Sequence, residues 1–129
     1  MSLFKQVNAV VLHVKNLNDG IYFYCNTLGH ELKWKSEDRA GLALGESTLV
    51  LSTTLHPETN ILVEAVEDAI KQMEENGGKI LSPLEDIPVG KLAVVEDPFG
   101  NKLTLIDFTK GTYATDNSGN IMGVEITTL

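Results

Sequence analysis

The chain has 129 residues, of which 43% are hydrophobic and 22% are charged, as in an ordinary globular protein. That length suits one domain with a proper hydrophobic core. The formal net charge of −8 argues against nucleic acid and anionic membranes as partners, because both favour clustered Lys and Arg, and ten basic residues are here scattered among eighteen acidic ones. The single cysteine excludes an intramolecular disulfide. With no signal-peptide or membrane-spanning pattern, we expect a cytoplasmic protein.

The first half of the chain predicts a strand, a helix and three more strands. Residues 9–14 alternate large apolar side chains with smaller or polar ones, which is typical of a strand with one buried face. Asn18 is the expected N-cap of a helix whose apolar side chains recur at helical spacing as far as Leu28, and Gly29 ends it. Three short strands follow, at residues 31–36, 40–44 and 48–53.

The second half of the chain repeats this plan. Ile61 and Val63 open a strand, and residues 67–76 form a helix with one apolar face that Gly77 and Gly78 end. The remaining strands are expected at residues 79–82, 91–96 and 102–108. Matching segments of the two halves lie 48 to 54 residues apart, which indicates a diverged duplication of one βαβββ module.

The repeat defines the expected domain organisation. One domain over residues 1–108 contains two modules, at about residues 7–53 and 58–108, and residues 109–129 form a C-terminal extension. Residues 112–120 are rich in Gly, Ser, Thr, Asn and Asp, which predicts a loop or tail. The alternation after them, at residues 122–126, is either a short strand or a loosely ordered terminus.

Three motifs carry a family resemblance. VKNL at residues 14–17, FYCNTLG at residues 23–29 and DPFGNKL at residues 97–103 resemble, in this order, the vicinal-oxygen-chelate superfamily. That group includes glyoxalases, extradiol dioxygenases, fosfomycin-resistance transferases and bleomycin-binding proteins. The resemblance covers roughly residues 7–108. It implies an α+β fold in which two βαβββ modules form a curved mixed sheet around a cleft, with the helices on the outside.

On such a fold the two faces of each strand have different roles, because alternate side chains point to opposite faces of a sheet. The large apolar set is expected to face the helices: Val10, Leu12, Val14, Leu49, Leu51, Ile61, Val63, Leu103 and Leu105. The mixed set is expected to line the cleft: Ala9, Val11, His13, Thr48, Val50, Ser52, Asn60, Leu62, Lys102, Thr104 and Ile106.

The resemblance also implies where a metal ion would bind. The metal ligands of the family fall here on Ala9, Val50, Glu58 and Thr104. Ala and Val offer no lone pair and Thr is a weak ligand, so one carboxylate remains where a catalytic Zn, Ni or Fe ion needs three or four donors. We therefore expect a metal-free cleft with no cofactor, in which glyoxalase chemistry lacks its electrophile.

Eight residues are the candidate ligand-binding set: His13, Trp34, Val50, Ser52, Glu58, Asn60, Lys102 and Thr104. His13 stands where glyoxalase-like relatives carry an Arg that grips a substrate carboxylate, and a partly buried His satisfied by a neighbour is an equal interpretation. Trp34 is either a stacking surface for a planar ligand or part of core or dimer packing. Lys102 and Thr104 point inward and suit an anionic or carbonyl group.

The favoured hypothesis is a homodimeric binding protein that holds a small organic molecule, aromatic or cationic, in this cleft. Whether the protein is an enzyme stays open. One alternative is a metal-independent lyase or isomerase, with His13 or Glu58 as the general base and Lys102 or Thr104 polarising a carbonyl. The other is a glyoxalase-type metalloenzyme with displaced ligands.

Overall fold

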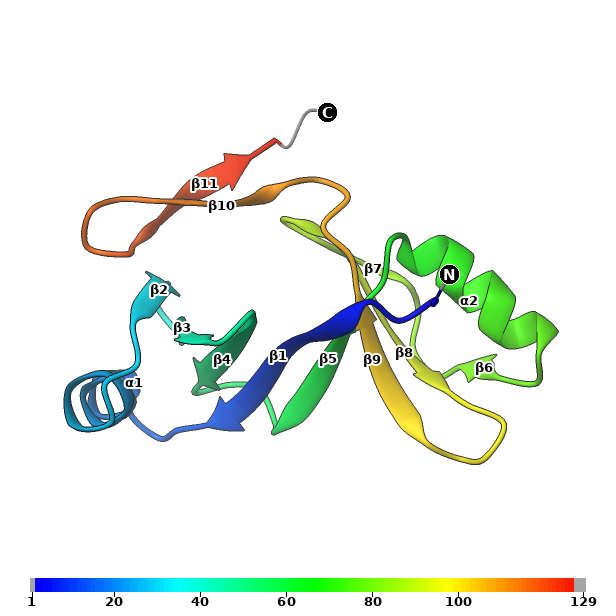
Figure 1. Cartoon of the computed structure of the whole chain (residues 1–129), viewed down its shortest axis with the longest axis horizontal. Coiled ribbons are helices and arrows are strands. Elements are labelled where there is room, and N and C mark those ends of the chain that lie inside the picture. The colour runs from blue at the N-terminus through cyan, green and yellow to red at the C-terminus, as the bar shows by residue number, and fades with distance from the viewer. Residues whose placement is uncertain (1, 127–129) are drawn as a thin grey trace. The chain divides into compact units, whose positions relative to one another are not determined.

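The computed structural model describes residues 2–126 (Figure 1). These residues divide into two compact units. Residues 8–59 and 113–123 make up one unit, called the first module. Residues 60–112, with residues 2–7 and 124–126, make up the other, called the second module.

The first module contains four strands of a mixed β-sheet and one helical segment. Its elements are β1 (Gln6–His13, from residue 8 on), α1 (Leu17–Ile21), the π-helix η1 (Tyr22–Thr27), β2 (Leu32–Lys35), β3 (Arg39–Leu44) and β4 (Ser47–Ser52). The strands lie in the order β2-β3-β4-β1. β1 runs parallel to β4, whereas β3 is antiparallel to both β2 and β4.

The second module repeats this arrangement. Its elements are β5 (Glu58–Leu62, from residue 60 on), α2 (Val66–Glu75), β6 (Lys79–Ile80), β7 (Glu85–Ile87), β8 (Gly90–Glu96) and β9 (Lys102–Ile106). The strands lie in the order β5-β9-β8-β6, and β7 adds to β8. β5 runs parallel to β9, as β1 does to β4. The α+β class and the mixed sheet are confirmed, and β7 is a strand that the sequence pattern did not predict.

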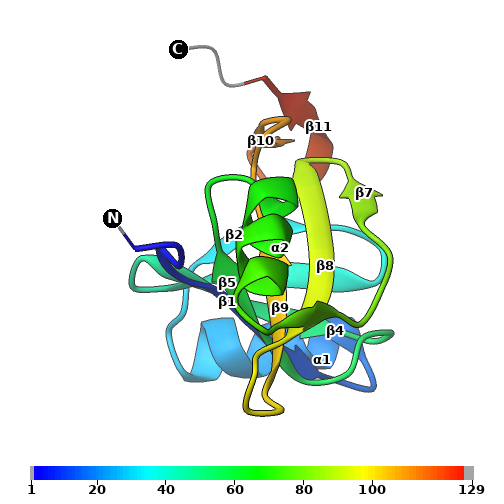
Figure 2. The same ribbon diagram turned by 90° about the vertical axis from the view of Figure 1, so that its right-hand side faces the viewer.

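The large apolar alternates of each strand pack beneath the helices, as predicted. In the first module Leu49 and Leu51 are buried, and Val10, Leu12 and Val14 pack with them against α1 and η1. The second module has the same construction around α2, which lies across β8 and β9 (Figure 2). Its core residues are Val63, Val66, Ala69, Ala93, Val95 and Leu105.

The start of α1 corrects one prediction. Asn16, not Asn18, is the N-cap: its backbone is extended, and its side-chain oxygen accepts the backbone N–H of Asp19 at 2.9 Å. Both asparagines satisfy the compositional rule for a cap. Asn18 lies inside the helix, which spans Leu17–Ile21.

A buried carboxylate fixes the start of α2. The N-cap residue, Ala65, has no polar side chain to cap the helix, and Asp107, directly after β9, takes this role. The Asp107 carboxylate accepts the backbone N–H of Val66 at 2.7 Å, that of Lys91 at 2.9 Å, and the hydroxyl of Thr109 at 2.8 Å. One side chain thus joins α2, β8 and the segment after β9.

The C-terminal extension is a hairpin of β10 (Thr112–Thr115) and β11 (Ile121–Glu125). Of the two interpretations left open for residues 122–126, the structure has the strand, and the prediction of a loop over residues 112–120 is wrong for residues 112–115. Its turn repeats the turn between β8 and β9: in both, an Asp carboxylate accepts the backbone N–H and the side-chain amide of an Asn four residues later (Asp97 with Asn101, Asp116 with Asn120). This D-x-x-G-N pattern marks both hairpins.

No helix among residues 2–126 is long and apolar enough to span a membrane.

We expect Asp107→Asn to lower the free energy of unfolding by about 2–3 kcal/mol, because an amide NH₂ would then face a buried backbone N–H. Urea unfolding measures this change. Asp116→Asn, in an exposed turn with a similar set of hydrogen bonds, is the control and should cost less. An equal loss in the two variants would contradict the role given to Asp107.

Candidate functional site

The inward face of the first module is filled by its own side chains. Ala9, Val11 and Val50 are buried there, and Trp34 and Leu55 pack against them. The strand register places Val11 beside Val50, Val50 beside Gly41, and Gly41 beside Trp34. This face is therefore a dry apolar cluster.

Trp34 owes its position to Gly41. Any Cβ at residue 41 would collide with the indole ring, so only glycine lets the ring lie against this strand. The ring of Tyr113, from the C-terminal hairpin, lies 5.6 Å from the indole ring between centroids. The hairpin also contacts β2 directly, because the backbone N–H of Lys35 donates to the carbonyl of Gly119 at 2.7 Å. Of the two interpretations of Trp34, the structure places it in packing.

Ser52 and His13 lie at the end of the same face. They are opposite each other in the parallel pair β1 and β4. Ser52 is fully buried, and its hydroxyl accepts the backbone N–H groups of Thr54 at 3.1 Å and Leu55 at 2.9 Å, so it holds the following turn. His13 is exposed and Glu58 is half-buried.

The inward face of the second module differs at the positions equivalent to Val11 and Val50, where two polar side chains are buried beside each other. Asn60 pairs with Thr104, and Thr104 pairs with Val94, across β5, β9 and β8. Asn60 is 8% exposed and Thr104 is 7% exposed. Ile106 is also buried on this face, and Lys102 at the other end of β9 is exposed.

Asn60 carries an unpartnered oxygen. Within residues 2–126, its Oδ1 atom is the buried side-chain polar atom for which the structure has no hydrogen-bond partner. Buried polar groups in native proteins are nearly always paired, and an unpaired one costs about 1–3 kcal/mol. The sequence pattern identified the position but not this lack of a partner.

The residues at the metal positions do not fit a metal ion. The side chains of Ala9 and Val50 have no donor atom and lie inside the apolar cluster of the first module. Thr104 adds one hydroxyl, and Glu58 is the one remaining carboxylate of the set. Among the residues that the structure describes, no three His, Cys, Asp or Glu side chains are grouped so that they could hold a metal ion.

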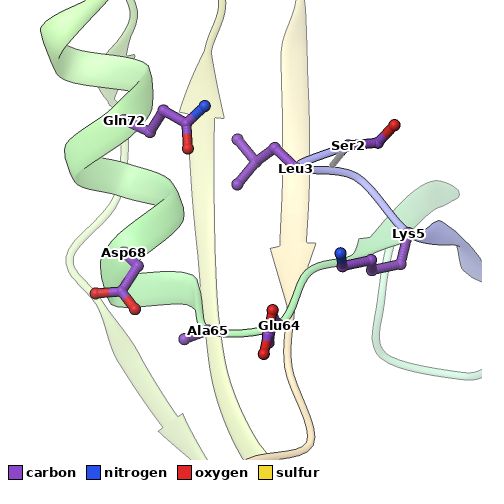
Figure 3. A pocket seen from close by; sticks show the side chains of 7 residues that line it. All are labelled: Ser2, Leu3, Lys5, Glu64, Ala65, Asp68 and Gln72. Carbon is purple, nitrogen blue, oxygen red and sulfur yellow. The ribbon is translucent and has the colours of Figure 1, made fainter.

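A cavity of about 330 Å³ lies elsewhere, on the helix side of the second module (Figure 3). It separates the N-terminal segment from the first turns of α2. None of the eight candidate residues lines it. Its lining is Ser2, Leu3, Lys5, Glu64, Ala65, Asp68 and Gln72.

Asp86, in β7, lies at the centre of a group of ion pairs, called the Asp86 cluster. Asp86 Oδ1 lies 3.0 Å from Lys91 Nζ and 2.9 Å from Lys110 Nζ, and the hydrogen bonds from these two lysines lower the pKa of Asp86 to about 2. Lys91 also lies 3.3 Å from Glu67, and its pKa is raised by its hydrogen bonds to Asp86 and Glu67. Burial raises the pKa of the Cys25 thiol, the direction opposite to that of an activated cysteine.

Comparison with known sequences identifies a family. Residues 6–105 match the model of the Glyoxalase/Bleomycin resistance protein/Dioxygenase superfamily. A protein of Mycolicibacterium smegmatis described as uncharacterized is 37% identical over 105 residues, which are 76% of this chain and 90% of that protein.

Solved structures share the fold. A hypothetical protein from Bacillus halodurans C-125 is 18% identical with a TM-score of 0.67, over 86% of this chain and 98% of that chain. A methylmalonyl-CoA epimerase from Mycobacterium tuberculosis is 16% identical with a TM-score of 0.65, over 83% of this chain and 90% of that chain. At these identities the likeness is one of fold and does not carry an activity.

We expect Gly41→Ala to displace the indole ring of Trp34 and to destabilise the protein by about 1–3 kcal/mol. Trp34 is the only tryptophan, so a red shift of the intrinsic fluorescence in the folded state reports its displacement. Leu44→Ala, at an exposed position of the same strand, is the control and should leave the emission unchanged. An unchanged spectrum of the Gly41 variant would show that the ring does not rest on this strand.

The Asp86 cluster predicts that the stability of the folded protein depends on pH. Because the pKa of Asp86 in the folded protein, about 2, lies below its ordinary value of 3.8, the stability it adds is complete above about pH 4 and is lost as the pH falls towards 2. Titration of the side-chain carboxyl carbon by NMR should give a midpoint near 2. The Asp86→Asn variant should lose less stability over this range than the wild type. A wild-type midpoint near 3.8 would contradict the cluster.

Proposed function

Because the chain belongs to the Glyoxalase/Bleomycin resistance protein/Dioxygenase superfamily, we propose that it binds a small organic molecule on the inward sheet face of its second module, without a metal ion. The observation that carries this proposal is the contrast between the two inward faces. The first carries the apolar Val11 and Val50, with Trp34 packed against them, whereas the second carries the polar Asn60 and Thr104 at the equivalent positions.

The metal-free state follows from the donor set. A catalytic ion of this family needs three or four N, O or S donors, and at two of the four positions the side chains are Ala9 and Val50. Both are buried among apolar neighbours, so no change of rotamer supplies a ligand. Binding therefore depends on shape, apolar contact and hydrogen bonds.

The composition of the face indicates the class of ligand. Val94, Ile106 and the half-buried Leu62 and Leu92 surround the polar pair, which suits a molecule with an apolar, planar body. The net charge of −8 favours a neutral or cationic molecule over an anionic one. An aromatic or cationic compound is the best match.

The enzymatic alternative has less support. A metal-independent lyase or isomerase needs a base held in position by a partner and a group that polarises a carbonyl. Ser52, which is opposite His13 in the strand pair, uses its hydroxyl to hold a turn instead. No observation favours catalysis over binding.

We also propose that the protein is a cytoplasmic homodimer. Tyr22, Phe23 and Leu28, at and after the π-helix, are 65%, 48% and 53% exposed, and large apolar side chains left exposed on one short segment suit an association surface. Native mass spectrometry distinguishes a dimer from a monomer, and a monomer at micromolar concentration would contradict this part of the proposal.

Divalent metal ions should not stabilise the protein. A metal ion at a free concentration of a hundred times its dissociation constant would add about 2.7 kcal/mol to the free energy of unfolding and would raise the Tm by several degrees. We expect no rise with Zn²⁺, Ni²⁺, Mn²⁺ or Fe²⁺ in thermal unfolding, and no fall on adding a chelator. Elemental analysis showing one tightly bound ion per chain would overturn the metal-free proposal.

Small aromatic and cationic compounds should bind the second module. In two-dimensional NMR titrations we expect shifted amide signals in β5, β8 and β9. Thr104→Val should weaken binding about fivefold, as expected for the loss of one hydrogen bond of about 1 kcal/mol. Thr48→Val, on the inward face of the first module, is the matched control and should leave affinity unchanged. Shifts confined to the cavity beside α2 would contradict the proposed site.

A further inference from the structure

We infer that the molecule bound by the second module donates a hydrogen bond, through an N–H or O–H group, to the Oδ1 atom of Asn60. This inference rests on the proposed function and adds the chemistry of the ligand. The observation behind it is that Asn60 is 8% exposed while its buried Oδ1 atom lacks a partner within residues 2–126.

The first module serves as an internal comparison. In the aligned repeat Asn60 corresponds to Val11 and Thr104 to Val50, and both pairs lie side by side in parallel strands with the same register. The first module folds with two valines at these positions. The fold therefore does not require a polar side chain there, and the buried amide of the second module needs another reason.

The buried amide destabilises the second module unless something pairs with it. A buried carbonyl oxygen without a donor loses its hydrogen bonds to water and gains none in return. Binding sites commonly retain such groups, because a ligand that supplies the missing partner is then favoured strongly over one that does not. Asn60 thus acts as a specificity-determining residue for ligand binding.

The acceptor selects among ligands. An oxygen acceptor repels carboxylate and phosphate oxygens and attracts an amide N–H, an indole-like N–H, a hydroxyl or an ammonium group. Thr104, on the neighbouring strand, can accept or donate and so tolerates a second polar atom next to the first. Val94 and Ile106 supply apolar contact for the rest of the molecule.

The stability of the free protein tests the unpaired oxygen. Asn60→Val, which copies the residue of the first module, should raise the Tm by about 4 °C because the unpaired group is removed. Asn8→Val, in strand β1, controls for the strand preference of valine and should change the Tm by less. Ser52→Ala removes a buried hydroxyl that does have partners and should lower the Tm. A fall in the Tm of Asn60→Val would overturn the inference, because it would mean that the amide is paired within the protein.

Binding of matched probes tests the ligand chemistry. The probes are indole with 1-methylindole, phenol with anisole, and acetanilide with N-methylacetanilide, which differ within each pair by the hydrogen-bond donor. We expect the wild type to bind the donor of each pair about tenfold more tightly, and Asn60→Val to bind both members equally. The signals of the Asn60 side-chain amide should shift with the donors.

The outcomes separate the two claims. Binding of the probes to the second module with no preference for donors contradicts the inference and leaves the proposed function standing. Failure of all six probes to bind the wild type contradicts the proposed function and the inference with it. A donor preference that persists in Asn60→Val overturns the inference, because another group would then supply the acceptor.

Discussion

The parallel pairing of the first and last strand of each module decides which side chains meet. In the first module it sets Val10 and Leu12 beside Leu49 and Leu51 on the helix side. The second module uses the same register, with Ile61 beside Leu105. Since side chains alternate along a strand, this choice also fixes the neighbours on the inward side. The core and the candidate site are therefore two consequences of one register.

The two inward faces show how a duplicated module acquires different roles. Valines and the Trp34 indole, which rests on Gly41 and contacts Tyr113 of the C-terminal hairpin, close the face of the first module. The second module holds Asn60 and Thr104 at the equivalent positions. A dry cluster stabilises the fold, and a buried polar pair reduces stability in return for selectivity. This difference between the two faces is the basis for proposing that the ligand binds to the second module.

The sequence predicted most of the strands, and it predicted which side of each strand packs against the helices, because apolar periodicity reflects burial directly. It misplaced the cap of α1 by two residues, since Asn16 and Asn18 obey the same local compositional rule for an N-cap. The packing of Trp34 depends on Gly41 across a strand pair and on Tyr113 from outside the repeat, which no local pattern reveals. Likewise, the sequence indicated Asn60 as an inward residue, but only the positions of its neighbours in the structure show that the amide oxygen lacks a partner among residues 2–126.

The central claim is that the second module offers an unfilled hydrogen-bond acceptor to an organic ligand and no site to a metal ion. A crystal structure of the protein, purified without chelator and soaked with the tightest-binding probe, tests it most directly. We expect density for the probe against β5, β8 and β9, with a donor atom about 2.7–3.2 Å from Asn60 Oδ1. An ion held by three or more protein atoms, or a protein group bonded to that oxygen, would contradict it.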